Sequence, residues 1–414
     1  MAARLAQRMS DRISSSGSAR VSIDRADLER AAEIAASGWA HPSPLRAERG
    51  EPLTIAWVTV PPGPGSGGHT TMFRLISALE DAGHRCILYL YDRHGWALEQ
   101  HEQTIRAWWP RVRAEVRDGA LGIEDAHALF ATAWETAYQV LASPARGVRF
   151  YLVQDFEPSF YPAGSESLLA EATYRFGFHG VTAGRWLAPL LRREYDMSAD
   201  HFDFGRDPVY SLRFPVRPEE RTAVCFYSRP DTPRRGYELG VIALDLFAKR
   251  HPEVDIHLYG IEGKRLPFAA TNHGLLTPDQ LNELYNRCIA GLVLSATNVS
   301  LVPHEMLAAG CIPVVNDAEH NRAVLCNPCV AYTPAAPFEL ANALCALVER
   351  PTAERLTLAN KAAASVQENS WEHAGATVVE IVERVVSDKV AGAGTSFSSV
   401  NAAPQPCLAA QTSI

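Results

Sequence analysis

The stretch GLVLSATNVSLVPHEMLAAGCIPVVND, residues 291–317, predicts a buried strand, a polar loop, a short helix and a second strand. The apolar runs at 292–294 and 312–315 supply the strands, and Gly310 ends the helix because glycine readily adopts the left-handed conformation. Glu305 near the helix start would lie beyond the carboxyl end of a parallel strand, where open α/β sheets place ligand contacts. Alternatively, its carboxylate only complements the helix dipole.

Composition narrows the class of protein. A chain of 414 residues suggests two domains plus ends, and 47% hydrophobic residues suffice for full-sized cores. The net charge of -8 argues against a nucleic-acid partner, since no basic excess offsets phosphates. The sequence contains no run of about 18 apolar residues, so no membrane-spanning helix is expected. Residues 1–20 lack the apolar centre of a secretory signal, and eight cysteines fit a reducing cytoplasm, so we expect a cytoplasmic location.

The N-terminal tail offers one route to a membrane. Its arginines at positions 4, 8, 12 and 20 suit peripheral contact with anionic lipid at the inner face of the membrane. A disordered tail explains them equally well, so both interpretations stay open.

Alternating strands and helices predict two sequential doubly wound, Rossmann-like α/β domains. LTIAWVTV (53–60), a glycine-rich loop, a helix at 70–82 and a strand at 86–92 form a β–α–β unit of the nucleotide-binding kind. The predicted organisation is a tail, helix and linker (1–50), a first domain (51–205), a second domain (206–370), a helix packing back on the first domain (371–390) and a disordered tail (391–414).

The loop from Gly63 to Gly68, GPGSGG, matches G-x-G-x-x-G, and Asp92 ends the next strand. Together they raise the hypothesis of an NAD-dependent dehydrogenase. The neighbouring prolines widen the loop, however, and Pro64 has no N–H to offer a phosphate. A more general interpretation is that Gly67 and Gly68 let a ligand approach the backbone at a helix N-terminus. The simplest alternative is a flexible turn.

Three arginines follow the first strand of the second domain. Arg229, Arg234 and Arg235 are placed to bind a diphosphate, because guanidinium groups stay charged and bind bidentately. The alternative is a solvated surface turn, with which Pro230 and Pro233 agree.

Polar side chains also follow the first-domain strand at 149–155. Asp155 is placed to act as a general base on an acceptor hydroxyl, with Gln154, Glu157 and Tyr161 in the same loop. Alternatively, Asp155 bonds its own backbone in a turn. The CxxC at 326–329 has no second ligand pair or histidine cluster at zinc spacing, so it is interpreted as a turn, and no cofactor is expected.

Taken together, these residues resemble a GT-B glycosyltransferase of the family 4 type, whose two domains face each other across a cleft. SLVPHEMLAAGCIPVV is similar to that family's P-x-x-E-A-M-A-x-G-x-P-V-V signature. The resemblance implies that Glu305 binds the ribose of the nucleotide and Arg229 the phosphates. Arg234 or Arg235 takes the place of the family's lysine. PGPGSGGHTT resembles the glycine loop that approaches the donor phosphates and sugar.

A narrower resemblance is to WsaF-type rhamnosyltransferases, carried by segments 151–188 and 226–240 and extending over about residues 50–385. It implies a dTDP-β-L-rhamnose donor, retention at the anomeric carbon and no required metal. The acceptor would be an oligosaccharide or a lipid-linked saccharide in surface-polysaccharide synthesis.

One position departs from the wider family, which carries two glutamates eight positions apart. Thr297 stands in place of the first. Thr297 and Asn298 can hydrogen-bond a sugar hydroxyl, but they cannot serve as the nucleophile of a covalent intermediate. A retaining reaction is then expected to use front-face attack, with the departing phosphate as base.

The sequence therefore predicts a two-domain sugar-nucleotide glycosyltransferase. Three alternatives stay open at this point: a nucleotide-sugar epimerase, the NAD-dependent dehydrogenase, and a non-catalytic nucleotide-sugar binding module.

Overall fold

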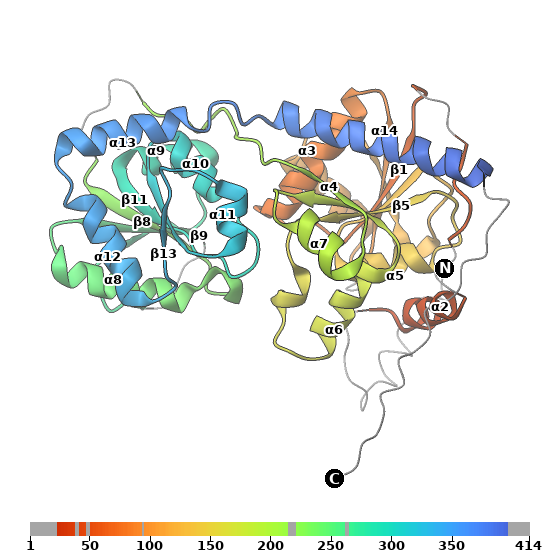
Figure 1. Ribbon diagram of the computed structural model, residues 1–414, viewed down its shortest axis with the longest axis horizontal. Helices are drawn as coiled ribbons and strands as arrows, with labels where there is room; N and C mark the ends of the chain where they lie inside the picture. The colour runs from red at the N-terminus through yellow and green to blue at the C-terminus, as the bar shows by residue number, and fades with distance from the viewer. Residues whose placement is uncertain are drawn as a thin grey trace, which may run out of the picture.

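The computed structural model describes residues 23–37, 41–46, 50–92, 95–213, 221–260 and 265–395. It contains two α/β domains side by side, each built on one parallel sheet (Figure 1). The arginine-rich tail at 1–20 lies outside the described residues. Within them, no helix is both long enough and apolar enough to cross a membrane.

The first sheet has seven parallel strands in the order β3-β2-β1-β4-β5-β6-β7. The order reverses between β1 and β4, which makes their carboxyl ends the topological switch point. The strands are β1 (Thr54–Thr59), β2 (Arg85–Leu90), β3 (Glu115–Asp118), β4 (Ala128–Ala131), β5 (Val148–Val153), β6 (His179–Ala183) and β7 (Ala199–Phe202).

Helices cover both faces of this sheet, so its central strands are buried on both sides. One face packs against α3 and α4, and the other against α5 and α7, with α2 and α6 further out. The helices are α2 (Arg25–Ala36), α3 (Gly67–Asp81), α4 (Leu98–Trp108), α5 (Trp134–Ala142), α6 (Ser165–Ala172) and α7 (Leu187–Tyr195).

The second sheet repeats the pattern with six parallel strands in the order β10-β9-β8-β11-β12-β13. Its switch point lies between β8 and β11. The strands are β8 (Ala223–Ser228), β9 (Asp255–Gly260), β10 (Thr271–Asn272), β11 (Cys288–Leu292), β12 (Ile312–Asn316) and β13 (Ala331–Thr333). The helices are α8 (Tyr237–Arg250), α9 (Pro278–Arg287), α10 (Val302–Ala308), α11 (Glu319–Leu325), α12 (Pro337–Val348) and α13 (Thr352–Ala364).

Three short strands, β3, β7 and β10, are absent from the sequence-based prediction. Each lies at the edge of its sheet. An edge strand has one hydrogen-bonded neighbour and needs little apolar surface, so it leaves no clear apolar run in the sequence. In β3, for example, Val116 is the only buried residue.

The chain crosses between the domains twice, and the two crossings lie together. The backbone N–H of Arg206 donates to the carbonyl of Asn369 at 3.2 Å. A Cβ on Gly205 would lie 2.5 Å from the backbone nitrogen of Trp371, so only glycine allows this approach.

Helix α14 (Trp371–Thr395) follows the second crossing and packs along α3 of the first domain (Figure 1). Arg384 on this helix binds Asp200 at 2.5 Å, and Glu383 lies 3.3 Å from His84. The helix runs to Thr395, so the predicted tail starting at 391 begins too early. Alanine favours a helix without supplying bulky apolar surface, which hid this extension from the sequence pattern. Residues 396–414 lie outside the described part of the chain.

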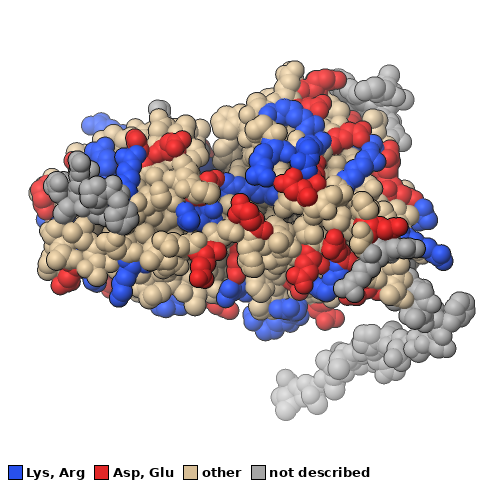
Figure 2. Space-filling model, turned by 90° about the horizontal axis from the view of Figure 1, so that it is seen from above, with Lys and Arg blue, Asp and Glu red and all other residues tan. Residues whose placement is uncertain are grey.

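Charges are mixed on the face that α14 crosses. Figure 2 shows Lys and Arg groups next to Asp and Glu groups there. This view therefore lacks the extended single-sign surface that marks a nucleic-acid-binding face.

Candidate functional site

A cavity of about 790 Å³ lies between the carboxyl ends of the two sheets and is lined by both domains. It sits where both sheets have their switch points, which is the expected ligand position for this class of fold. Seven predicted site residues line it: Gly67, Gly68, Asp155, Arg229, Arg234, Arg235 and Glu305.

The glycine loop forms the first-domain wall at the start of α3. The loop is fixed at one side by His69, which bonds the Ser66 hydroxyl at 2.8 Å and lies 3.2 Å from the Val60 carbonyl. A Cβ on Gly68 would make an ordinary 3.6 Å contact with Gln154. Because α3 begins at Gly67, its first N–H groups and the positive end of its dipole lie at the cavity wall.

Asp92, the acid that the dehydrogenase hypothesis needs, is not among the residues lining the cavity. Its carboxylate accepts a hydrogen bond from the Trp96 backbone at 2.6 Å and lies 3.4 Å from His101 Nε2. These contacts tie Asp92 to Trp96, just before α4, and to His101 on that helix. The arrangement therefore disfavours the dinucleotide interpretation of the glycine loop.

The three arginines come from the turn between β8 and α8. The Arg229 guanidinium lies 6.0 Å from the centroid of the Tyr227 ring, and that of Arg234 lies 4.1 Å from the centroid of Phe160 in the first domain. Arg235 donates to the Ser295 hydroxyl at 3.0 Å, and burial lowers its pKa. Arg229 and Arg234 thus offer their charge to the cavity, whereas Arg235 also holds the loop that follows β11.

Glu305 lies on α10, half-buried in the cavity wall. Burial raises the pKa of its carboxyl to about 7, while Arg74 acts to lower it and Asp207 to raise it. Arg74 binds Asp207 at 2.5 Å and stacks on Trp371, 4.5 Å from the ring centroid. The sequence prediction missed Arg74, although an arginine inside the apolar stretch of α3 is a signal that could have found it.

The structure corrects the placement of Thr297 and Asn298, which we expected to contact the donor sugar. Neither lines the cavity; Thr297 is 2% exposed and Asn298 is fully buried. The Asn298 amide donates to the carbonyls of Gln154 (2.9 Å) and Ala183 (3.0 Å), both in the first domain. Both hydrogen bonds that the Asn298 side-chain amide donates join the two domains, so this amide is not available to a sugar hydroxyl.

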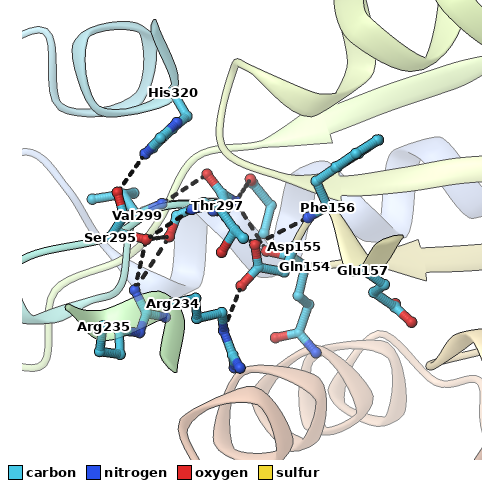
Figure 3. Close-up of polar contacts among 12 residues, drawn as sticks. Gln154, Asp155, Phe156, Glu157, Arg234, Arg235, Ser295, Thr297, Val299 and His320 are labelled. Carbon is cyan, nitrogen blue, oxygen red and sulfur yellow. Dashed lines mark hydrogen bonds and ion pairs between the residues drawn. The ribbon is translucent and has the colours of Figure 1, made fainter. Parts of the chain in front are cut away.

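Asp155 lies at the end of β5 and receives hydrogen bonds from both domains. Its Oδ1 accepts from its own neighbour Phe156 at 3.0 Å and from the Asn298 backbone at 2.7 Å (Figure 3). Its Oδ2 lies 3.4 Å from Arg234 Nε. The local turn anticipated as an alternative is therefore present, together with contacts from the opposite domain.

Next to Asp155 the cavity wall is aromatic and acidic. Trp134 donates from its indole to the Tyr161 hydroxyl at 2.9 Å, and both line the cavity with Phe160. Glu157 is 5% exposed and accepts from the Trp134 backbone at 2.7 Å. Burial, reinforced by the charge of Glu135, raises the pKa of Glu157 to about 8. Rings with hydrogen-bonding groups at their edge suit the flat faces and hydroxyls of a sugar.

One cluster among the described residues has metal-binding types. Ligand atoms of His251, Cys345 and Glu349 lie within 4.8 Å of one another, and none of the three lines the cavity. Arg250 donates to the Cys345 sulfur at 3.5 Å, which opposes a cation there. The geometry is that of a partly buried polar network.

Comparison with known proteins agrees with this architecture. The model of the WsaF N-terminal domain matches residues 96–183, and that of the WsaF C-terminal domain matches residues 222–345. The O-antigen biosynthesis protein RfbC of Myxococcus xanthus is 33% identical over 350 residues, which are 79% of this chain and 27% of that protein. The chain therefore spans about a quarter of the length of this relative.

Two solved structures share the fold at low identity. Sucrose-phosphate synthase from Thermosynechococcus elongatus has a TM-score of 0.61 at 13% identity, over 81% of this chain and 99% of that one. Anabaena HepE, solved in complex with UDP-glucose, has a TM-score of 0.59 at 15% identity, over 82% and 100%. Two doubly wound parallel sheets opposed across one cavity, with these neighbours, define a GT-B protein. Within that class, the chain belongs to the WsaF family.

Proposed function

We propose that this chain is a glycosyltransferase that moves L-rhamnose from dTDP-β-L-rhamnose to a saccharide acceptor in surface-polysaccharide synthesis. The observation that carries the proposal is the opposition, across one cavity, of an arginine-rich wall from the second domain and an aromatic, acidic wall from the first. We assign residues 206–370 to the donor and residues 51–205 to the acceptor.

At the donor wall, Arg229 and Arg234 hold the diphosphate, assisted by the N-terminus of α3 beyond Gly67 and Gly68. Glu305 accepts a hydrogen bond from the sugar of the nucleoside. Tyr259 and Leu276 line the same end of the cavity and offer an apolar surface to the base. Arg235 supports this wall through its bond to the loop after β11.

At the acceptor wall, the rings of Phe160 and Tyr161 bind the face of a sugar, and Asp155 accepts a hydrogen bond from the reacting hydroxyl. The acceptor oxygen then attacks the anomeric carbon from the side of the leaving group. The bond between that carbon and the phosphate oxygen breaks, the new glycosidic bond forms, and the acceptor proton passes to the departing diphosphate. Arg229 and Arg234 stabilise the negative charge that grows on the diphosphate.

Front-face attack fits the surroundings of Thr297 better than a covalent intermediate does. Its hydroxyl is a poor nucleophile, and it is buried outside the cavity lining. The configuration at the anomeric carbon of the product tests this step: an inverted product would overturn the retaining mechanism while leaving transfer itself in place.

The choice of L-rhamnose rests on membership of the WsaF family, and the setting rests also on the name of the Myxococcus relative. The binding of UDP-glucose by HepE supports a nucleotide-sugar donor as a class. A lipid-linked acceptor would place the reaction in the cytoplasm, with peripheral contact at the inner face of the membrane. Binding to vesicles of anionic and neutral lipid tests that contact.

The decisive experiment incubates the chain with dTDP-L-rhamnose, UDP-glucose and UDP-N-acetylglucosamine, each with rhamnose-ended and other saccharide acceptors. A glycoside formed from dTDP-L-rhamnose alone supports the proposal. Conversion of the donor without an acceptor indicates an epimerase, and binding of dTDP without turnover on any acceptor indicates a binding module. Stabilisation by NADH in preference to dTDP in a thermal-shift assay would favour the dehydrogenase.

A further inference from the structure

The loop between β11 and α10 reaches out of the second domain and into the first. Asn298, at its tip, is fully buried, and every polar group of the residue is bonded. Its side-chain amide donates to the carbonyls of Gln154 and Ala183, and its backbone N–H donates to Asp155. Its own carbonyl accepts from the Ser295 hydroxyl at 2.5 Å, and its Oδ1 accepts from the Val299 backbone at 2.9 Å.

The second domain holds the base of this loop rigidly. The backbone N–H of Ser295 donates to the side chain of Asn316 at 2.9 Å, and that side chain donates back to the Ser295 carbonyl at 2.7 Å. His320 lies 2.9 Å from the same carbonyl (Figure 3). Its ring lies 5.3 Å from the ring of Trp186 in the first domain. The base of the loop is therefore held by hydrogen bonds that come from the second domain itself.

One first-domain partner of the loop is the carboxylate of Asp155. Among the described residues, the only hydrogen bond that this carboxylate receives from its own domain comes from the Phe156 backbone. The Asn298 backbone and Arg234, both from the second domain, supply the remaining polar contacts. Separating the domains would remove two of the three groups that aim Asp155.

We infer that Asn298 is a positioning residue that assembles the acceptor site: by docking on Gln154 and Ala183, it brings its backbone N–H to Asp155 only when the domains are closed. This inference rests on the proposed function of Asp155. It differs from a purely structural role for Asn298, because it makes the orientation of the reacting hydroxyl depend on closure over the donor. Transfer is thereby favoured over attack by water, which needs no such orientation.

The test compares Asn298→Ala with Asn342→Ala, an asparagine on the outer face of α12 whose side chain binds Arg250. For Asn298→Ala we expect kcat for transfer to fall about 10- to 100-fold, as for a misplaced reacting group. Its Kd for dTDP should stay within about twofold of the wild type, since the nucleotide contacts are untouched, and a larger share of the donor should be hydrolysed. Asn342→Ala should match the wild type in kcat for transfer, in the Kd for dTDP and in the share of donor hydrolysed. Wild-type transfer and an unchanged hydrolysis share in Asn298→Ala would overturn the inference.

A second variant and a second measurement cover the case in which Asn298→Ala does not fold. Ser295→Ala removes one of the two donors to the Asn298 carbonyl, the other being Arg235, and should shift the transfer-to-hydrolysis ratio in the same direction, by a smaller factor. Asn298→Asp puts a carboxylate against two carbonyl oxygens, so small-angle scattering without ligand should show a larger radius of gyration than the wild type. An unchanged scattering profile would contradict the docking role. Scattering needs no turnover, so it stays informative even if the wild type forms no glycoside and the proposed function fails.

Discussion

Arg234 of the second domain lies 3.4 Å from the carboxylate of Asp155 in the first, so the proposed diphosphate-binding and acceptor-binding groups are paired across the cavity. Both side chains are largely shielded, at 29% and 12% exposed, so this pair is stronger than one on an open surface. A diphosphate that enters the cavity would compete with the Asp155 carboxylate for Arg234. Part of the attraction between Arg234 and Asp155 would then be replaced by attraction between Arg234 and the diphosphate.

Asp155→Asn should separate donor binding from transfer. We expect transfer to fall by about 100-fold, the lower end of the range for losing a group that assists proton transfer, because Asp155 orients the reacting hydroxyl while the diphosphate takes its proton. Binding of dTDP should stay equal or become tighter, because Arg234 loses a competing anion. Titration calorimetry with dTDP, next to initial rates, checks both. A variant that binds dTDP at least tenfold more weakly would place Asp155 among the donor contacts instead.

Arg229→Ala should abolish most of the transfer activity. Removing one preorganised donor from a growing negative charge typically costs about 100- to 1,000-fold in kcat. The matched control is Arg193→Ala on α7, an exposed arginine that pairs with Glu194 outside the cavity. Initial rates at saturating donor measure the effect, and equal rates in the two variants would remove Arg229 from the reaction.

Substitutions at Gly68 should separate the effect of a methyl group from that of a large side chain. A Cβ there makes only a 3.6 Å contact with Gln154, so Gly68→Ala should keep the fold and most of the affinity for donor. Gly68→Trp projects into the cavity and should raise the Kd for dTDP-sugar at least tenfold, with an unchanged melting temperature. Equal affinities in the two variants would show that the donor does not approach this part of the glycine loop.

The buried acid Glu157 should make stability depend on pH. Its pKa is raised from 4.5 to about 8, so the folded chain binds more protons than the unfolded chain between these values. The free energy of unfolding should therefore fall as the pH rises through this window, by up to about 1.4 kcal/mol per pH unit from this group.

Urea unfolding at several pH values measures that slope. Glu157→Gln keeps an acceptor for the Trp134 backbone without a charge, so it should flatten the slope, whereas exposed Glu380→Gln should not. A wild-type slope that survives in Glu157→Gln would assign the effect to another group, with Glu305 as the next candidate because its pKa is raised to about 7.

Val382→Ala should weaken the attachment of α14. Val382 is fully buried, and shortening a buried aliphatic side chain costs about 1–3 kcal/mol of unfolding free energy. The exposed Glu380→Ala on the same helix should cost less than about 0.5 kcal/mol. Neither residue lines the cavity, so dTDP affinity should be the same in both variants. Equal stability of the two would mean that the packing of α14 contributes little.

The apolar strands and the helices between them could be predicted from local patterns in the sequence. Two buried strands flanking Glu305 and a strand before each cavity loop predicted the parallel sheets, and the GT-B arrangement is confirmed. Seven of the predicted site residues line one cavity because the carboxyl ends of parallel strands gather loops at one edge of a sheet.

Contacts between segments distant in the chain were beyond those patterns. Arg74 meets Asp207 only because α3 faces the crossing between the domains. Asn298 reads as a sugar ligand by its position next to Thr297, yet its partners Gln154 and Ala183 belong to the other domain. No local periodicity reports which side of a closed cavity a loop residue faces.

Helix α14 also has a consequence for biosynthesis. The strands of the first sheet are complete at β7, but the helix that covers part of α3 leaves the ribosome only after the whole second domain. During translation, the apolar residues of α3 that later meet α14 stay exposed to water or to chaperones. The N-terminal domain of this chain therefore becomes complete last, although its sheet is synthesised first.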